Sequence, residues 1–183
     1  MLIDANKASL LMVDLQHRLL PVMANANEVR KRCLTLLKAA DRLKVPVTFS
    51  EQYPHGLGPT ILPLRDQAPD APVFAKMSFS CWKDAPLKAH LISHHEQSRP
   101  IVILAGIEAH VCVLQTALDL AAAGFGVFAV ADAMSSRANY SVLLAHERMR
   151  QSGIIIVNTE MVIFELLRQA GTPDFQALAP LIR

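Results

Sequence analysis

Three residues with chemically useful side chains stand at or near the ends of apolar runs. Asp14 ends "SLLMVD", Lys76 ends "PVFAK", and Cys112 follows "PIVILAG" at the start of a helical pattern. A thiol in the first turn of a helix lies at the positive end of the helix dipole, which lowers the thiol pKa. A carboxylate opposite can take the thiol proton, and a lysine can keep that carboxylate ionised. These residue types suit acyl transfer through a thioester.

From the residues alone, core packing is the stronger explanation for Cys112, because free cysteine is among the most buried residue types. The chain has 3 cysteines, Cys33, Cys81 and Cys112, without a C-x-x-C pair. An odd number with this spacing argues against a disulfide framework or a zinc site. We therefore expect free thiols in a reducing, cytoplasmic environment, and both packing and catalysis stay open for Cys112 at this point.

The elements that would position these residues alternate along the chain. Short apolar runs rich in β-branched residues predict six strands, over Ser9–Asp14, Val45–Glu51, Pro72–Lys76, Pro100–Gly106, Gly126–Asp132 and Gly153–Asn158. Stretches with helical spacing predict helices over Asn27–Leu43, Ala85–His95, Val111–Ala123, Asn139–Gln151 and Met161–Ala170.

This alternation indicates an α/β fold with three layers, in which a six-stranded parallel sheet is covered by helices on both faces. We expect the doubly wound strand order 3-2-1-4-5-6 and a single domain over residues 1–183. Open sheets of this kind bind ligands at the carboxyl ends of the strands, where the strand order reverses. Strands one and four would be neighbours there, so Asp14 and Cys112 should face each other. The long irregular insert Gln52–Ala71 should help to form the site.

Composition argues against several classes of partner. Lys and Arg number 18 against 16 Asp and Glu, and the basic residues are scattered, so we expect no nucleic-acid partner. No apolar run reaches the ~18 residues that would span a bilayer, so we expect no membrane partner. The mean hydropathy of +0.28 and the apolar helix "VCVLQTALDLAAAG" favour a homo-oligomer.

Three sequence blocks resemble the motifs of the isochorismatase-like cysteine hydrolases, a superfamily that includes nicotinamidases and N-carbamoylsarcosine amidases. The blocks are "LLMVDLQHRLLP", "VFAKMSFSCW" and "LAGIEAHVCVLQTA", and the similarity continues to "ADAMSSR". It covers essentially the whole chain. Within the superfamily, "SEQYPHGLGPT" together with "KMSFSCW" is most similar to the isochorismatase domain-containing proteins.

The resemblance implies that Asp14, Lys76 and Cys112 form the catalytic triad of a cofactor-independent hydrolase acting on a small amide or related C–N bond. It also implies a cis peptide between Ile107 and Glu108, which would aim the N–H groups of Glu108 and Cys112 at one point, an oxyanion hole. We expect further substrate contacts from five residues: Leu19, Gln52, Tyr53, Phe79 and Trp82.

Two differences from members of the superfamily argue against two of its known reactions. Nicotinamidases carry an Asp-x-His metal motif after the second strand, where this chain has Glu51, Gln52, Tyr53 and His55. Glu51 and His55 lie four apart but lack an evident third ligand, so we expect no metal. True isochorismatases replace the cysteine, so the presence of Cys112 argues against the reaction that named the family.

Two other functions stay open. In the first, the chain is a family member whose site no longer turns over substrate, and it serves as a binding or scaffold protein. Retention of all three polar residues argues against this function. In the second, Cys112 is a redox thiol. It has no resolving cysteine beside it in sequence, but Cys81 could approach it in space.

Overall fold

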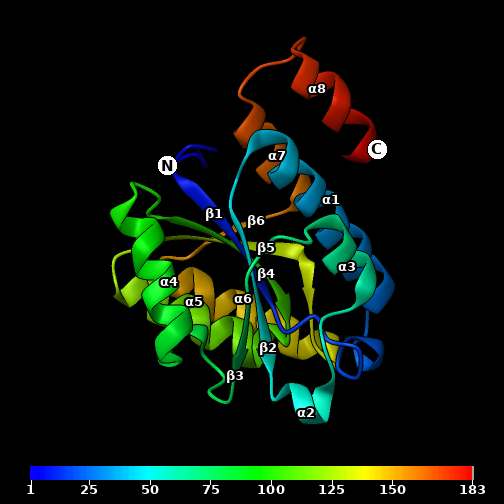
Figure 1. Cartoon of the computed structure of the whole chain (residues 1–183), viewed down its shortest axis with the longest axis vertical. Helices are drawn as coiled ribbons and strands as arrows, with labels where there is room; N and C mark the ends of the chain where they lie inside the picture. The colour runs from blue at the N-terminus through cyan, green and yellow to red at the C-terminus, as the bar shows by residue number, and fades with distance from the viewer. Residues whose placement is uncertain (183) are drawn as a thin grey trace.

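The computed structural model describes residues 1–182 (Figure 1). Over these residues six strands form one sheet, in which every neighbouring pair is parallel. The order β3-β2-β1-β4-β5-β6 confirms the predicted doubly wound topology. The strands are β1 Ala8–Val13, β2 Val47–Gln52, β3 Val73–Lys76, β4 Ile101–Ile107, β5 Gly126–Ser135 and β6 Ile155–Val157.

Helices cover both faces of this sheet. Their bounds are α1 Ala26–Leu43, α2 Pro54–Leu57, α3 Leu62–Gln67, α4 Ala85–Glu96, α5 Leu114–Ala122, α6 Asn139–Gln151, α7 Thr159–Leu167 and α8 Pro173–Leu178. Short single turns lie at Leu20–Val22, Cys81–Lys83, Ala109–Val113 and Ala179–Ile182. Figure 1 shows α1, α3 and α7 on one side of the sheet and α4, α5 and α6 on the other.

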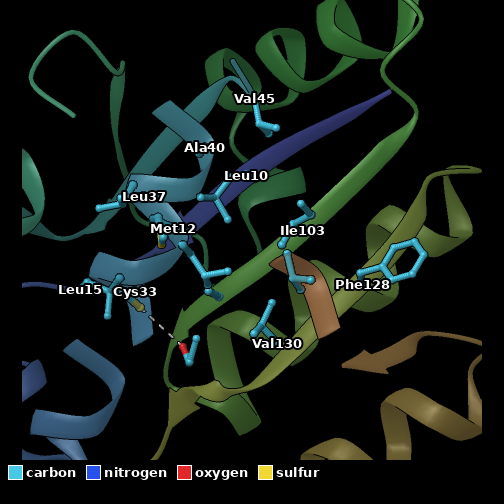
Figure 2. Close-up of a cluster of buried hydrophobic side chains, with 14 of the residues drawn as sticks. Leu10, Met12, Leu15, Cys33, Leu37, Ala40, Val45, Ile103, Phe128 and Val130 are labelled. Carbon is cyan, nitrogen blue, oxygen red and sulfur yellow. Dashed lines mark hydrogen bonds between the residues drawn. The ribbon is translucent and has the colours of Figure 1, made fainter. Parts of the chain in front are cut away.

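The core consists of one apolar layer on each side of the sheet. Alternate residues of β1 point to opposite faces, so Leu10 and Met12 pack under α1 while Leu11 and Val13 pack under α4 and α5. Figure 2 shows the first layer, in which Cys33 of α1 points inward among the apolar side chains. All six residues of β1 are buried, as is usual for the central strand of a parallel sheet.

Gly106 sets how closely β4 approaches β1. Its φ is 128°, and a Cβ at this position would lie 2.1 Å from the backbone oxygen of Val13. A glycine is therefore required where the two central strands end side by side. This close contact places the turn after β4 beside the residue that follows β1.

The pairing of β4 with β5 is interrupted near the same edge. β5 advances from Ala129 to Met134 while β4 advances only from Leu104 to Gly106. The extra residues of β5 leave the ladder, and pairing resumes where Gly106 lies opposite Met134.

The structure corrects three expectations. The insert Gln52–Ala71 is not irregular, because it contains α2 and α3, each with a proline in its first turn. The type and position of Ser135 and Ser136 in "DAMSSR" predict helix caps, but Ser135 ends β5 and α6 follows Ala138. The helix predicted from Val111 begins as the π-helical turn Ala109–Val113, and α5 itself starts only at Leu114.

Candidate active site

Asp14 directly follows β1 and takes a left-handed backbone conformation, with φ 53°. Its side chain is fully buried. Both carboxylate oxygens accept hydrogen bonds: Ser50 Oγ donates to Oδ1 over 2.7 Å, and Lys76 Nζ donates to Oδ2 over 2.8 Å. The Asp14 backbone N–H donates to the Ser50 backbone oxygen over 3.1 Å, which fixes the residue to β2.

Lys76 ends β3, two strands away from β1, and its side chain is fully buried. Its ammonium reaches across the end of β2 to Asp14. Burial alone would lower the lysine pKa, but the negative charge of Asp14 and of the nearby thiol sites Cys81 and Cys112 outweighs it, so the pKa is raised. Lys76 therefore remains a cation, and the predicted pairing of these two side chains is present.

Cys112 lies in the π-helical turn after β4 and is 5% exposed. Burial raises the pKa of its thiol most, and the charge of Asp14 raises it further; the charge of Lys76 lowers it, but not enough to reverse the direction. The expectation that the start of a helix would lower this pKa is therefore wrong, because desolvation in the α4–α5 layer outweighs the helix dipole. Cys112 rests as a protonated thiol beside the Asp14–Lys76 pair.

The turn from Ile107 to Cys112 is held by the loop that follows β5. The peptide bond between Ile107 and Glu108 is cis. The carboxylate of Glu108 accepts hydrogen bonds from Arg137 N over 3.2 Å and from Arg137 Nε over 3.1 Å. In the same turn, His110 Nδ1 lies 2.9 Å from Ser136 Oγ. Sequence reasoning missed Arg137, although it ends the "ADAMSSR" block.

The five expected substrate contacts lie in different surroundings. The side-chain amide of Gln52 makes hydrogen bonds within the protein. Its Oε1 accepts from Lys76 Nζ and its Nε2 donates to the Met77 backbone oxygen, each over 2.8 Å. Trp82 packs edge-on against Phe125 at 5.6 Å between ring centroids, in the α4–α5 layer. The remaining three differ in exposure: Tyr53 and Phe79 are exposed, and Leu19 is half-buried.

A hollow of about 450 Å³ lies beside β3 and is lined by residues of the insert, of β3 and of the chain that follows it. Tyr53 and His55 line it from the insert side. Lys76, Met77 and Ser78 line it from the β3 side. Tyr53 is thus placed next to the segment that holds the Lys76 ammonium.

Sequence reasoning also missed a polar layer behind Asp14. Ser50 is fully buried in β2, and Cys81 Sγ donates to its Oγ over 3.5 Å. Burial first, and then the charge of Asp14, raise the pKa of Cys81 to about 11. The signal was present in the sequence, because Thr48 and Ser50 are polar residues on one face of β2, whereas Val47 and Phe49 on the other face are apolar.

The residues considered for a metal have other contacts. Glu51 Oε1 accepts hydrogen bonds from Thr60 N over 2.6 Å and from Thr60 Oγ1 over 2.8 Å, which fastens the insert to β2. His55 lies exposed on α2. In the part of the chain that the structure describes, no three His, Cys, Asp or Glu residues are grouped as a metal site would need. Likewise, none of the helices within residues 1–182 could cross a bilayer.

Together the fold and the site define an α/β protein of the doubly wound class, with a buried carboxylate–lysine pair and a thiol at the point where the strand order reverses. The isochorismatase domain model matches residues 8–161. The chain belongs to the isochorismatase family, a hydrolase superfamily.

Curated relatives agree with this assignment. The chain is 43% identical over 152 residues to a protein of Phytophthora sojae named secreted isochorismatase effector Isc1, covering 81% of this chain and 71% of the relative. It is 36% identical to isochorismatase domain-containing protein 2A of Mus musculus, covering 95% of this chain and 82% of the relative.

Solved structures share the fold along the whole chain. A structure named MAR1 ribonuclease, from Caenorhabditis elegans, superposes with a TM-score of 0.91 at 35% identity, covering 100% of this chain and 92% of that one. The YcaC protein of Escherichia coli, described as an octameric hydrolase of unknown specificity, superposes with a TM-score of 0.92 at 26% identity, covering 99% and 90% of the two chains.

Proposed function

We propose that the chain is a cysteine hydrolase that cleaves a small amide or related C–N bond through a thioester on Cys112. The observation that carries this proposal is the buried Asp14–Lys76 ion pair, 2.8 Å long, whose charges both act on the Cys112 thiol. Burying two charged side chains costs free energy, which favours a functional role for them. The Asp14 carboxylate is the base that the Cys112 thiol needs to become a nucleophile.

In the proposed reaction, Asp14 takes the thiol proton as the Cys112 sulfur attacks the substrate carbonyl carbon. Proton transfer and attack are coupled, because burial keeps the resting thiol protonated. The negative oxygen that forms is held by the backbone N–H groups of Glu108 and Cys112. Asp14 then gives its proton to the leaving nitrogen as the C–N bond breaks, which leaves a thioester on Cys112.

The second half of the reaction uses the same base. Asp14 takes a proton from water, whose oxygen attacks the thioester carbon. The C–S bond breaks, the sulfur takes the proton back from Asp14, and the acid product leaves. Lys76 keeps Asp14 anionic between these transfers. None of these steps uses a cofactor or a metal ion.

A panel of small amides assayed for ammonia release tests the proposal, with Cys112→Ala as the variant and Cys33→Ala as the matched control. Cys33 is buried on the other face of the sheet. We expect turnover in the wild type and in Cys33→Ala, and a loss of at least about a thousandfold in Cys112→Ala. Because one structural relative is named a ribonuclease, RNA is included as a substrate. Equal turnover by Cys112→Ala, or turnover of RNA alone, would overturn the proposal.

We also propose that the chain forms a homo-oligomer. Tyr140, Leu143 and Leu144 of α6 are 70%, 65% and 44% exposed, which leaves an apolar stripe on the outer face of this helix. The YcaC relative is described as octameric. Light scattering should find a multimer in the wild type and in the control variant Leu62→Lys, whose site is 72% exposed on α3, on the other face of the sheet. It should find a smaller species in Leu143→Lys. A wild-type monomer at micromolar concentration would contradict the proposal.

A cytoplasmic location stays a prediction. It is supported by the three cysteines, all of which are free and buried. Fractionation of cells that express the tagged chain would test it.

A further inference from the structure

Two buried residues of β2 contact the two members of the ion pair from the same side of the sheet. Ser50 and Gln52 are two positions apart, so their side chains point to one face. Ser50 is paired with Val13, at the end of β1, and Gln52 is paired with Lys76 in β3. The ladder register of β2 therefore brings Ser50 to Asp14 Oδ1 and Gln52 to the Lys76 ammonium.

The Lys76 ammonium is saturated by the protein itself. An ammonium has three donor hydrogens. Lys76 Nζ has four acceptors: Asp14 Oδ2 and Gln52 Oε1, each at 2.8 Å, and the backbone oxygens of Phe79 at 3.0 Å and Ser78 at 3.2 Å. No hydrogen is left over for a substrate atom. Lys76 can act on the reaction only through its charge and its contact with Asp14.

Gln52 is itself rigidly held. Its Nε2 donates to the Met77 oxygen over 2.8 Å, so both ends of the side-chain amide are used. Its backbone N–H donates to Gln16 Oε1 over 2.7 Å, and its backbone oxygen accepts from Gln16 Nε2 over 2.9 Å. Gln16 is fully buried. Each polar atom of the Gln52 side chain is thus already bonded within the protein, and one Nε2 hydrogen is left over.

We propose that Ser50 and Gln52 are positioning residues that hold the Asp14–Lys76 pair from its two ends, and that neither Gln52 nor Lys76 binds substrate. Ser50 sets the orientation of the carboxylate, and Gln52 fixes the ammonium against it. The kinetic consequences of this arrangement rest on the proposed hydrolase function, whereas its effect on the Cys112 thiol does not. The proposal also replaces the expectation that Gln52 contacts the substrate.

The kinetic test compares Ser50→Ala and Gln52→Met with Thr48→Val. Thr48 is the matched control, because it is buried in the same strand, faces the same side and bonds to His90 away from the ion pair. We expect kcat to fall about tenfold or more in Ser50→Ala and Gln52→Met, with KM within about twofold of the wild-type value. Thr48→Val should lose thermal stability without a change in kcat, and Ser50→Thr, which keeps the hydroxyl, should restore most of the loss.

A substrate ligand would behave differently. If Gln52→Met raised KM and left kcat unchanged, Gln52 would be a binding residue and the proposal would be wrong for it. Unchanged kcat and KM in Ser50→Ala would overturn the role of Ser50.

A second test needs no substrate. The positive charge of Lys76 lowers the pKa of the Cys112 thiol, so loosening the ammonium should slow the alkylation of that thiol. With iodoacetamide at pH 8 and mass spectrometry of the labelled peptide, we expect alkylation of Cys112 to be at least about threefold slower in Gln52→Met than in Thr48→Val or the wild type. An unchanged rate would overturn the role of Gln52 even if the hydrolase function held. A slower rate in a protein that hydrolyses no amide would uphold the positioning role and reject the proposed function.

Discussion

At the scale of single residues, Asp14 is the most constrained position of the site. Its left-handed backbone, its bonded N–H and its two bonded carboxylate oxygens tie it to β2 and β3 at once. The carboxylate therefore supports the fold as well as the proposed chemistry. Substitutions here should change stability and activity together.

We predict that Asp14→Asn lowers the free energy of unfolding by about 3–5 kcal/mol, because it leaves the buried Lys76 ammonium without its counterion. The control is Asp174→Asn, which breaks the surface pair between Arg42 and Asp174 and should cost less than about 1 kcal/mol. Urea unfolding measures both. An Asp14→Asn variant as stable as the control would show that the ion pair is not buried as described.

The raised pKa of Cys112 leads to a prediction about pH. A thiol well below its pKa gains thiolate roughly tenfold per pH unit, and only the thiolate is alkylated. We therefore expect the iodoacetamide rate at Cys112 to rise roughly tenfold per unit from pH 7 to pH 9. Cys33 and Cys81 should react more slowly throughout, because both are fully buried. A rate that levels off by pH 8 would mean that the thiol is ionised near neutrality.

At the scale of elements, the close approach of β4 to β1 depends on Gly106. We predict that Gly106→Ala lowers the free energy of unfolding by about 3 kcal/mol or more, since the new Cβ would meet Val13 O and the backbone conformation disfavours other residues.

The matched control is Gly124→Ala, which also has a positive φ of 89° but has open space around the added Cβ. It should cost about 1–2 kcal/mol from backbone strain alone. Urea unfolding of both variants separates the close contact from the strain, and equal costs would show that the contact with Val13 relaxes freely.

The elements that the sequence predicted were those with a strong periodic signal. The six apolar runs became the six strands, and α6 matches its predicted bounds of Asn139–Gln151. The helices α2 and α3 were missed, because pieces of four and six residues are too short to show helical periodicity. The π-helical turn was missed because sequence periodicity does not separate it from the first turn of α5.

The site was predictable only in part, because some of its contacts depend on strand register and on packing, which leave no local sequence pattern. Asp14 and Lys76 both end strands, and parallel strands bring their carboxyl ends to one edge, so their proximity followed from the topology. Gln52 meets Lys76 because of the pairing register of β2 and β3, which no local pattern specifies. The raised pKa of Cys112 depends on its burial in the apolar layer formed with α4 and α5, and no local sequence pattern shows how these helices pack over the turn.

At the scale of the whole molecule, partly buried histidines tie stability to pH. Burial lowers the pKa of His90, His94 and His146 in the folded state. His94 packs against His90 with ring centroids 4.5 Å apart, and its two ring nitrogens are buried without a hydrogen-bond partner within residues 1–182. The positive charges of His90 and Arg99 lower its pKa further. The unfolded chain therefore binds protons at these residues more readily than the folded chain does.

The sign of the effect follows from that difference. The histidine contribution to the free energy of unfolding should be fully present above the pKa of histidine in the unfolded chain, about 6.5. It should be lost progressively as the pH drops below that value. Urea unfolding at pH 7.5 and pH 5.5 should show the loss, and His94→Leu should reduce it. His17→Leu, at an exposed position, serves as the control and should leave it unchanged. Equal stability at the two pH values would contradict the prediction.

The interrupted pairing of β5 bears on how relatives of this chain should be aligned. Because the extra residues leave the ladder and return to it, their number can change without disturbing the pairing on either side. A gap placed inside this strand is then structurally sound, although gaps in strands are usually penalised. The counterpart of Arg137 in another family member should accordingly be found by counting back from the start of α6, not forward from the start of β5. The same holds for Ser136.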